Sequence, residues 1–200
     1  WGGDRSNEMA LRQRGLSYSD ISKLGGGISK TVENTRSHSI QDLVDLGVQR
    51  ASNALRMGTT TMEAKSGYGL STESELKLLE ATERVNRISV CDIQATWLGA
   101  HDVPKQNNKE EYIEELISKQ LPMVVEQGIA VWADVFCEPG WFTVDDTIEI
   151  ITASKNVGLG SRIHADEFLD SGGLGIAAEL GSISADHVAK SDDDSRAKAH

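Results

Sequence analysis

The chain has 200 residues, of which 38% are hydrophobic and 5% aromatic, and it carries a formal net charge of −11. This length is enough to bury a hydrophobic core in one domain. The Lys and Arg residues are scattered among Asp and Glu, so phosphate backbones and anionic membrane surfaces repel the chain. Composition therefore disfavours nucleic acid and membranes as partners.

The sequence also lacks targeting and crosslinking signals. No apolar run approaches the ~20 residues that span a bilayer, and the first residues, WGGDR, have neither the basic start nor the apolar stretch of a signal peptide. We therefore expect a cytoplasmic protein. Cys91 and Cys137 each lie in an apolar strand-like segment without CxxC spacing, which predicts buried free thiols.

Residues 1–38 differ from the rest of the chain. They are polar, rich in Arg, Ser and Gly, and contain the run GGG at residues 25–27. We interpret them as a long loop with a short helix that covers one end of a sheet, and a loop of that length inside a domain is usually functional. Residues 39–200 are interpreted as successive βα units.

The first of these units are marked by periodicity and by caps. Apolar residues at helical spacing over residues 43–55 predict a helix, which Gly58 is placed to end. Residues 59–64 form a β-rich run before a turn at residues 66–69. A second helix, apolar on one side as far as residue 85, is predicted to start with Thr72 as its N-cap and Glu75 as the capping-box partner.

The later elements follow the same alternation. A strand is predicted at residues 92–98, then a polar loop at 105–109 and a helix at 110–127 that Pro122 kinks or divides. Another strand at residues 131–137 precedes a helix at 144–156, which is closed by Gly158. The remaining elements are a strand at residues 162–165, a helix at 175–180 and a strand at 182–187.

Five predicted strands that alternate with helices indicate an α/β fold with a parallel sheet. Periodicity alone allows either an open doubly wound sheet or part of a closed (β/α)₈ TIM barrel. A complete barrel needs eight strands and usually ~250 residues. The chain would then supply about five to six of the eight βα units.

Polar side chains follow each predicted strand at its carboxyl end. In order along the chain these are Tyr68, His101, Glu138, then His164 with Asp166 and Glu167, and finally Asp186 with His187. The carboxyl ends of parallel strands meet at one edge of the sheet, so we expect these side chains to share one cleft. Several imidazoles and carboxylates together form the donor set of a metal-dependent hydrolase.

Each of these residues also has a purely structural interpretation. A single His after a strand is more often a hydrogen-bonded turn residue than a ligand, although three on separate units favour a common site. Glu138, beside a Pro-Gly turn, either accepts turn amides or contacts a substrate. Tyr68, between two glycines, either packs or is presented into the cleft. His38 and His200 are expected at the surface.

One motif indicates a different function. Residues 173–178, GLGIAA, match the GxGxxA pattern of dinucleotide-binding proteins. That pattern has to follow a strand directly, whereas residues 164–171 intervene here. Dinucleotide binding is therefore disfavoured.

Ordered motifs give the chain a resemblance to the imidazolonepropionase family. Residues 65–70 (KSGYGL), followed by TESELK at 72–77, are similar to the family's KSGYGL-x-x-x-x-E-LK signature. Further segments agree in order: GGDR at 2–5, GGGI at 25–28, LGAH at 98–101, DVFCE at 134–138, HADE at 164–167 and SADH at 184–187. The resemblance runs from the first residue to about Lys190.

The resemblance implies a reaction and a set of roles. Members of the family are metal-dependent amidohydrolases with a (β/α)₈ barrel, and they convert 4-imidazolone-5-propanoate and water into N-formimidoyl-L-glutamate. By resemblance, His164 would bind a single Zn or Fe ion and Arg5 would bind the propionate of the substrate. Tyr68 and His101 would hold the imidazolone ring and its carbonyl oxygen.

The resemblance also implies a proton donor or acceptor, Glu167, that touches the substrate beside the metal, and places His187 near the metal and the attacked carbonyl. The family's His-x-His pair and its Asp ligand after the eighth strand have no counterpart in these residues. We therefore expect a central fragment that is inactive alone, and whose unpaired strand edges favour self-association into a homo-oligomer. The alternatives are another cyclic-amide amidohydrolase and a non-catalytic α/β binding module.

Overall fold

The structure is a computed structural model that describes the backbone of residues 1–200 and the side chains of all but residues 18, 19 and 22. Five parallel strands form one sheet in the order β1-β2-β3-β4-β5. The strands are β1 (Thr61–Lys65), β2 (Asp92–Ala100), β3 (Trp132–Cys137), β4 (Gly160–Ala165) and β5 (Ser184–His187).

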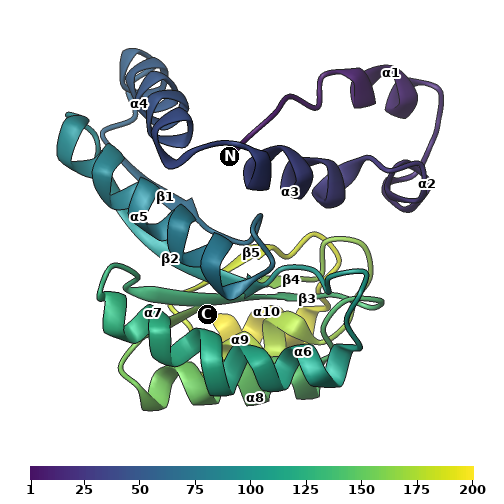
Figure 1. The fold of residues 1–200 in the computed structure, drawn as a ribbon. Coiled ribbons are helices and arrows are strands. Elements are labelled where there is room, and N and C mark those ends of the chain that lie inside the picture. Colours follow the sequence, from purple (N-terminus) through teal and green to yellow (C-terminus); the bar gives the residue numbers. More distant parts are fainter.

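The strand order separates the two folds that the sequence allowed. In a doubly wound sheet the order reverses at a switch point, whereas here each strand lies beside the next one along the chain. The sheet curls, and helices follow its strands, as in Figure 1. The chain is thus an α/β protein with the architecture of a partial (β/α)₈ barrel, and five strands of such a barrel are present.

The helices connect and flank these strands. The connecting helices are α5 (Thr72–Ile88), α6 (Lys109–Glu115), a π-helical stretch (Leu116–Gln120), α7 (Leu121–Gln127), α8 (Val144–Asn156) and α9 (Gly173–Glu179); α4 (Ile40–Arg56) precedes β1 and α10 (Asp193–Ala199) follows β5. None of the helices in the described part of the chain is long and apolar enough to cross a membrane.

Side chains alternate along each strand, so the sheet has an apolar face and a polar face. On β3, Ala133, Val135 and Cys137 pack into the main hydrophobic core under the connecting helices. Asp134, between them, points to the opposite face, where it meets Lys65 and His164. Cys91 and Cys137 are both buried and free, which confirms the prediction for the cysteines.

Helix starts and breaks follow local chemistry. Ser71, not Thr72, is the N-cap of α5, and its side chain accepts from the amide of Ser74. The predicted capping box is therefore wrong, since the carboxylate of Glu75 accepts from the turn before the helix instead. The predicted division near Pro122 is confirmed: a π-helical stretch ends at Gln120, two residues before the proline, which lacks an amide donor.

The amino-terminal segment is more helical than the sequence indicated. It contains α1 (Asn7–Gln13), α2 (Tyr18–Lys23) and α3 (Gly27–Ser37) instead of one short helix. Small and polar residues such as Thr31 and Thr35 are buried on α3, so the usual apolar periodicity is hidden. In Figure 1 these three helices extend away from the layered helices under the sheet.

Helix α3 attaches this segment to the turn after β1. Ile28 and Val32 form a small apolar cluster with Leu70. The guanidinium of Arg36 donates to the carbonyl oxygens of Gly69 and Leu70, at 2.6 and 3.0 Å. The KSGYGL turn is therefore fixed from the side of the amino-terminal segment.

Candidate active site

A row of rings crosses the carboxyl ends of the strands. The ring centroids of Tyr68 and His101 are 4.9 Å apart, those of His101 and His164 are 6.2 Å apart, and those of His164 and His187 are 5.3 Å apart. Nε2 of His187 lies 3.4 Å from Oε2 of Glu167. Five of the residues singled out in the sequence thus lie side by side at one edge of the sheet.

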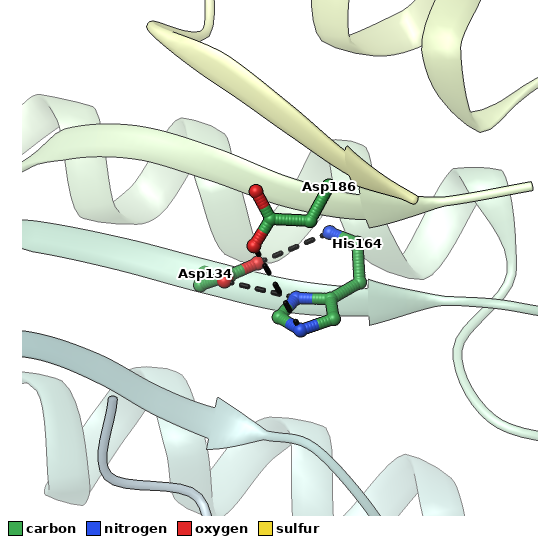
Figure 2. Close-up of side chains that lie close together, drawn as sticks. All are labelled: Asp134, His164 and Asp186. Atoms are coloured by element: carbon green, nitrogen blue, oxygen red, sulfur yellow. Dashed lines mark hydrogen bonds and ion pairs between the residues drawn. The ribbon is translucent and has the colours of Figure 1, made fainter. Parts of the chain in front are cut away.

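The middle of this row is an acidic and basic cluster around His164. Its Nδ1 lies 2.9 Å from Oδ2 of Asp134, and its Nε2 lies 4.0 Å from Oδ2 of Asp186 (Figure 2). The first contact has the distance of a hydrogen bond but not its direction. The backbone amide of His164 donates to the other oxygen of Asp134, at 3.2 Å.

Lys65 supplies the positive charge of the cluster. Its Nζ lies 2.6 Å from Oδ2 of Asp134, 3.0 Å from Oδ2 of Asp186 and 3.1 Å from Oε1 of Glu63. The side chain of Asp134 is completely buried, and a buried carboxylate is stable only with charged or hydrogen-bonding partners. Lys65 and the neighbours of Asp134 on β4 provide them.

The pKa values record this mutual stabilisation. Burial raises the pKa of Asp134, but the charges of His164 and Lys65 outweigh burial and lower it to about 2. Burial lowers the pKa of Lys65 and of His164, and in both cases the charge of Asp134 outweighs burial and raises the pKa above its ordinary value. The carboxylate is thus the electrostatic centre of the cluster.

A metal ion could be held at His164. Asp134, His164 and Asp186 offer donor atoms that all lie within 4.8 Å of one another. Two ligands on one tetrahedral ion with ~2.1 Å bonds are about 3.4 Å apart, close to the 4.0 Å between Nε2 of His164 and Asp186. The ammonium of Lys65 lies beside the carboxylates of both Asp134 and Asp186, and its charge repels a metal ion placed between these two carboxylates. His164 therefore fits a metal through Nε2, with Asp134 behind it.

His101 is a buried and neutral ring. Its Nδ1 lies 2.8 Å from the carbonyl oxygen of Gly67, and burial lowers its pKa to about 4. A carbonyl oxygen only accepts, so we assign the proton to Nδ1 and leave Nε2 as an acceptor. Burial also raises the pKa of Tyr68, which keeps its hydroxyl protonated.

Arg5 lies outside this row. Its Nε and Nη2 donate to Oε2 of Glu8, at 3.1 and 2.8 Å, and the other oxygen of Glu8 accepts from the amide of Gly27. The charge of Arg5 lowers the pKa of Tyr68, against the rise that burial causes. The guanidinium is therefore nearer to the Tyr68 end of the row than to its middle.

Two further carboxylates shape the loop after β4. Oε1 of Glu138 accepts from the backbone amides of Glu167 and Phe168, so its amide partners lie in the loop after β4 and not in its own Pro-Gly turn. Asp166 accepts from the amides of Gly173 and Leu174 and from the hydroxyl of Ser191. The GLGIAA segment lies in α9, separated from β4 by the seven residues 166–172.

Sequence reasoning placed neither Lys65 nor Asp134 at the site, and it assigned Glu75 only to a capping box. A signal was present for Asp134, because a charged residue in the middle of the apolar strand WADVFC needs a buried partner. Lys65 is the last residue of β1, which lies two strands before β3. Strand alternation indicates that its side chain is on the same face of the sheet as Asp134. The contact of Glu75 with the turn had no such signal, since its spacing matched an ordinary capping box.

A partial parallel barrel with histidines and carboxylates at the carboxyl ends of its strands has the layout of barrel enzymes, whose active sites lie at this end. Among known proteins, the chain is similar to enzymes of one name. The chain is 43% identical over 189 residues to the imidazolonepropionase of Alkaliphilus metalliredigens, covering 94% of this chain and 45% of that protein. It is 44% identical over 199 residues to the imidazolonepropionase of Symbiobacterium thermophilum, covering 98% of this chain and 47% of that protein.

The resemblance to imidazolonepropionases is thereby confirmed along almost the whole chain. The chain spans about 45% of the length of these relatives. No family model matches it. A crystal structure of a mandelate racemase/muconate lactonizing enzyme candidate from Sorangium cellulosum has 12% sequence identity and a TM-score of 0.32, covering 72% of this chain and 51% of that one.

Proposed function

We propose that the chain forms the central part of an imidazolonepropionase, a hydrolase that opens the ring of 4-imidazolone-5-propanoate to give N-formimidoyl-L-glutamate. The observation that carries the proposal is the row of Tyr68, His101, His164 and His187 at the strand ends, in a chain about 43% identical to enzymes of that name. The substrate is a small molecule with a planar ring and one carboxylate.

The rings and Arg5 bind and orient this substrate in the proposed function. The neutral His101, with its proton on Nδ1, accepts a ring N–H through Nε2. The hydroxyl of Tyr68 stays protonated and donates to an oxygen of the substrate. The guanidinium of Arg5 provides the planar pair of donors that a propionate requires.

His164 is the residue of this chain that would hold a Zn or Fe ion, through Nε2. Asp134 lies behind its Nδ1 at 2.9 Å, as carboxylates commonly do behind metal-binding histidines. Such an ion, when bound, polarises a carbonyl and lowers the pKa of water towards ~7. The other protein ligands in this proposal come from sequence beyond these residues.

Glu167 and His187 are the proton-transfer pair in this proposal. Their side chains are 3.4 Å apart, and both are partly exposed at the mouth of the sheet. A carboxylate and an imidazole at that distance can pass a proton between them while either one faces the substrate. Glu167 takes or gives the proton at a ring nitrogen, and His187 faces the attacked carbonyl.

We also propose that these 200 residues do not catalyse the reaction alone. The sheet pairs only its own five strands, and among the described residues nothing pairs with the outer edges of β1 and β5. Such edges favour association between copies.

Turnover of 4-imidazolone-5-propanoate by the complete protein, with metal analysis of the same sample, tests the function. We expect hydrolysis to N-formimidoyl-L-glutamate and about one equivalent of Zn or Fe per chain. Hydrolysis of other cyclic amides but not of this substrate would favour a different amidohydrolase. Neither metal nor turnover would favour a non-catalytic binding module and would contradict the proposal.

A further inference from the structure

The turn at residues 66–70 is held by one buried carboxylate. Glu75, on the first turn of α5, is 0% exposed. Its Oε2 accepts from the amide of Gly67 at 2.6 Å, and its Oε1 accepts from the amides of Gly69 and Leu70 at 2.7 and 2.9 Å. A single side chain therefore binds three backbone amides within four residues of the turn.

This turn carries or contacts two rings of the site. Tyr68 lies between the bound amides, and the carbonyl oxygen of Gly67 is the partner of Nδ1 of His101. The turn packs closely against His101: Gly67 has a φ of +78°, and a Cβ there would lie 2.9 Å from Nδ1 of His101. Movement of the turn therefore moves both rings.

Helix α5 does not need Glu75 for its own start. The side chain of Ser71 already accepts from the amide of Ser74, as an N-cap does. Burying a carboxylate is costly unless it is well hydrogen-bonded, and the hydrogen bonds of Glu75 go to the amides of the turn. The conformation of the turn is what this buried charge maintains.

The turn is also strained, which makes such support necessary. Leu70 has a φ of 50°, in the left-handed region that is sterically unfavourable for a residue other than glycine. The amide of this same residue is one of the three bound by Glu75. Arg36 binds the carbonyl oxygens of Gly69 and Leu70 from the other side. The turn is thus held through its amides and its carbonyls.

We propose that Glu75 is a positioning residue whose carboxylate fixes the turn at residues 66–70 and, through it, the placement of Tyr68 and His101 towards the substrate. The proposal rests on the proposed function, because that function makes the two rings substrate contacts. Glu75 itself touches no substrate. Its removal should therefore weaken substrate binding more than the chemical step.

Glu75→Gln in the complete protein is the test, because the amide side chain keeps the shape but replaces one acceptor oxygen with a donor. We expect KM to rise at least about tenfold while kcat changes less than about threefold. Glu73→Gln, an exposed substitution on the same helical turn, is the matched control and should leave both values unchanged. If Glu75→Gln does not fold, Glu75→Asp, which keeps the charge but shortens its reach, is measured with the same expectation.

Repeating the substitution in a Tyr68→Phe background separates positioning from general stability. We expect Glu75→Gln to raise KM by a clearly smaller factor there, because the hydroxyl that it misplaces is already absent. An equal factor in both backgrounds would overturn the proposal and leave Glu75 as a stability residue.

Amide hydrogen exchange gives a readout that needs no substrate. In Glu75→Gln the amides of Gly67, Gly69 and Leu70 should exchange faster, while those in the middle of α5 keep their wild-type rates. Unchanged exchange at the turn would refute the positioning role. Faster exchange in a protein without turnover of the imidazolone would instead reject the proposed function and leave the support of the turn intact.

Discussion

Nζ of Lys65, at the end of β1, lies 2.6 Å from Oδ2 of Asp134 on β3, although the two residues belong to strands that are not neighbours in the sheet. The side chain of Lys65 spans β2 above Thr96, with which Lys65 is paired in register. Thr96 has a small side chain, and its hydroxyl donates to Glu63. It therefore leaves room for the side chain of Lys65 to reach from β1 to β3. Three strands are thereby joined on the polar face.

Lys65→Met should destabilise the protein by about 2–4 kcal/mol, since it takes from a buried carboxylate one of its two cationic partners. Asp134→Asn should lower the free energy of unfolding by a similar amount. The double variant should lose at least ~1 kcal/mol less than the sum, because the two substitutions remove one interaction. Urea unfolding of the three variants measures this coupling.

Lys198→Met is the control for that cycle. Lys198 pairs with Glu179 at 2.9 Å, but both side chains are more than half exposed. A surface pair of this kind contributes at most ~1 kcal/mol. Additive losses for Lys65→Met and Asp134→Asn would show that the two side chains do not stabilise each other.

Arg5→Met should lower kcat/KM for 4-imidazolone-5-propanoate by about 10²-fold in the complete protein, on the order of a lost charged hydrogen bond to the propionate. The loss should fall on KM. Arg14→Met, which changes an exposed arginine at the end of α1, should have no effect. Since Arg5 also pairs with Glu8, the unfolding midpoint of each variant has to be recorded. An unchanged kcat/KM would contradict the assignment of this substrate.

Much of the sheet could be predicted because its signals are local. The helix at residues 144–156 has a capping threonine at one end and a glycine after the other, and the structure gives those bounds. The polar residues after the strands converge because parallel strands present their carboxyl ends together. Alternation along β3 could have added Asp134, as a charged side chain opposite the core.

The rest depends on contacts between distant residues. Lys65 and Asp134 are 69 positions apart, and no local pattern pairs them. Glu75 has the spacing of a capping box, but the strained turn before the helix offers its carboxylate three amides instead of one. Helix α3 buries threonines and a glycine, so its inner face resembles a loop in the sequence.

The pH dependence of stability should differ between the wild type and Glu75→Gln. Burial raises the pKa of Glu75 above its ordinary value of 4.5, although hydrogen bonds from Ser66 and from the turn amides oppose the rise. A raised pKa in the folded state means stabilisation that is present below the unfolded pKa and is lost as pH rises through the folded pKa.

The wild type should therefore lose stability relative to Glu75→Gln as pH rises above ~4.3, until Glu75 is fully ionised in the folded protein. Urea unfolding of both proteins between pH 4 and pH 8 checks this. A difference in unfolding free energy that grows in favour of the wild type over this range would contradict the sign.

His164→Asn should reduce metal affinity in the complete protein by at least about 100-fold, because it removes the nitrogen that the cluster presents. Asp134→Asn should reduce affinity less, by about 10-fold or more, since it removes the carboxylate behind the ring rather than the proposed ligand. Competition with a chelator measures both values, and His200→Asn, on an exposed histidine outside the cluster, is the control. If Asp134→Asn costs as much as His164→Asn, Asp134 is itself a ligand, and Lys65 has to move away from its Oδ2 when the ion binds.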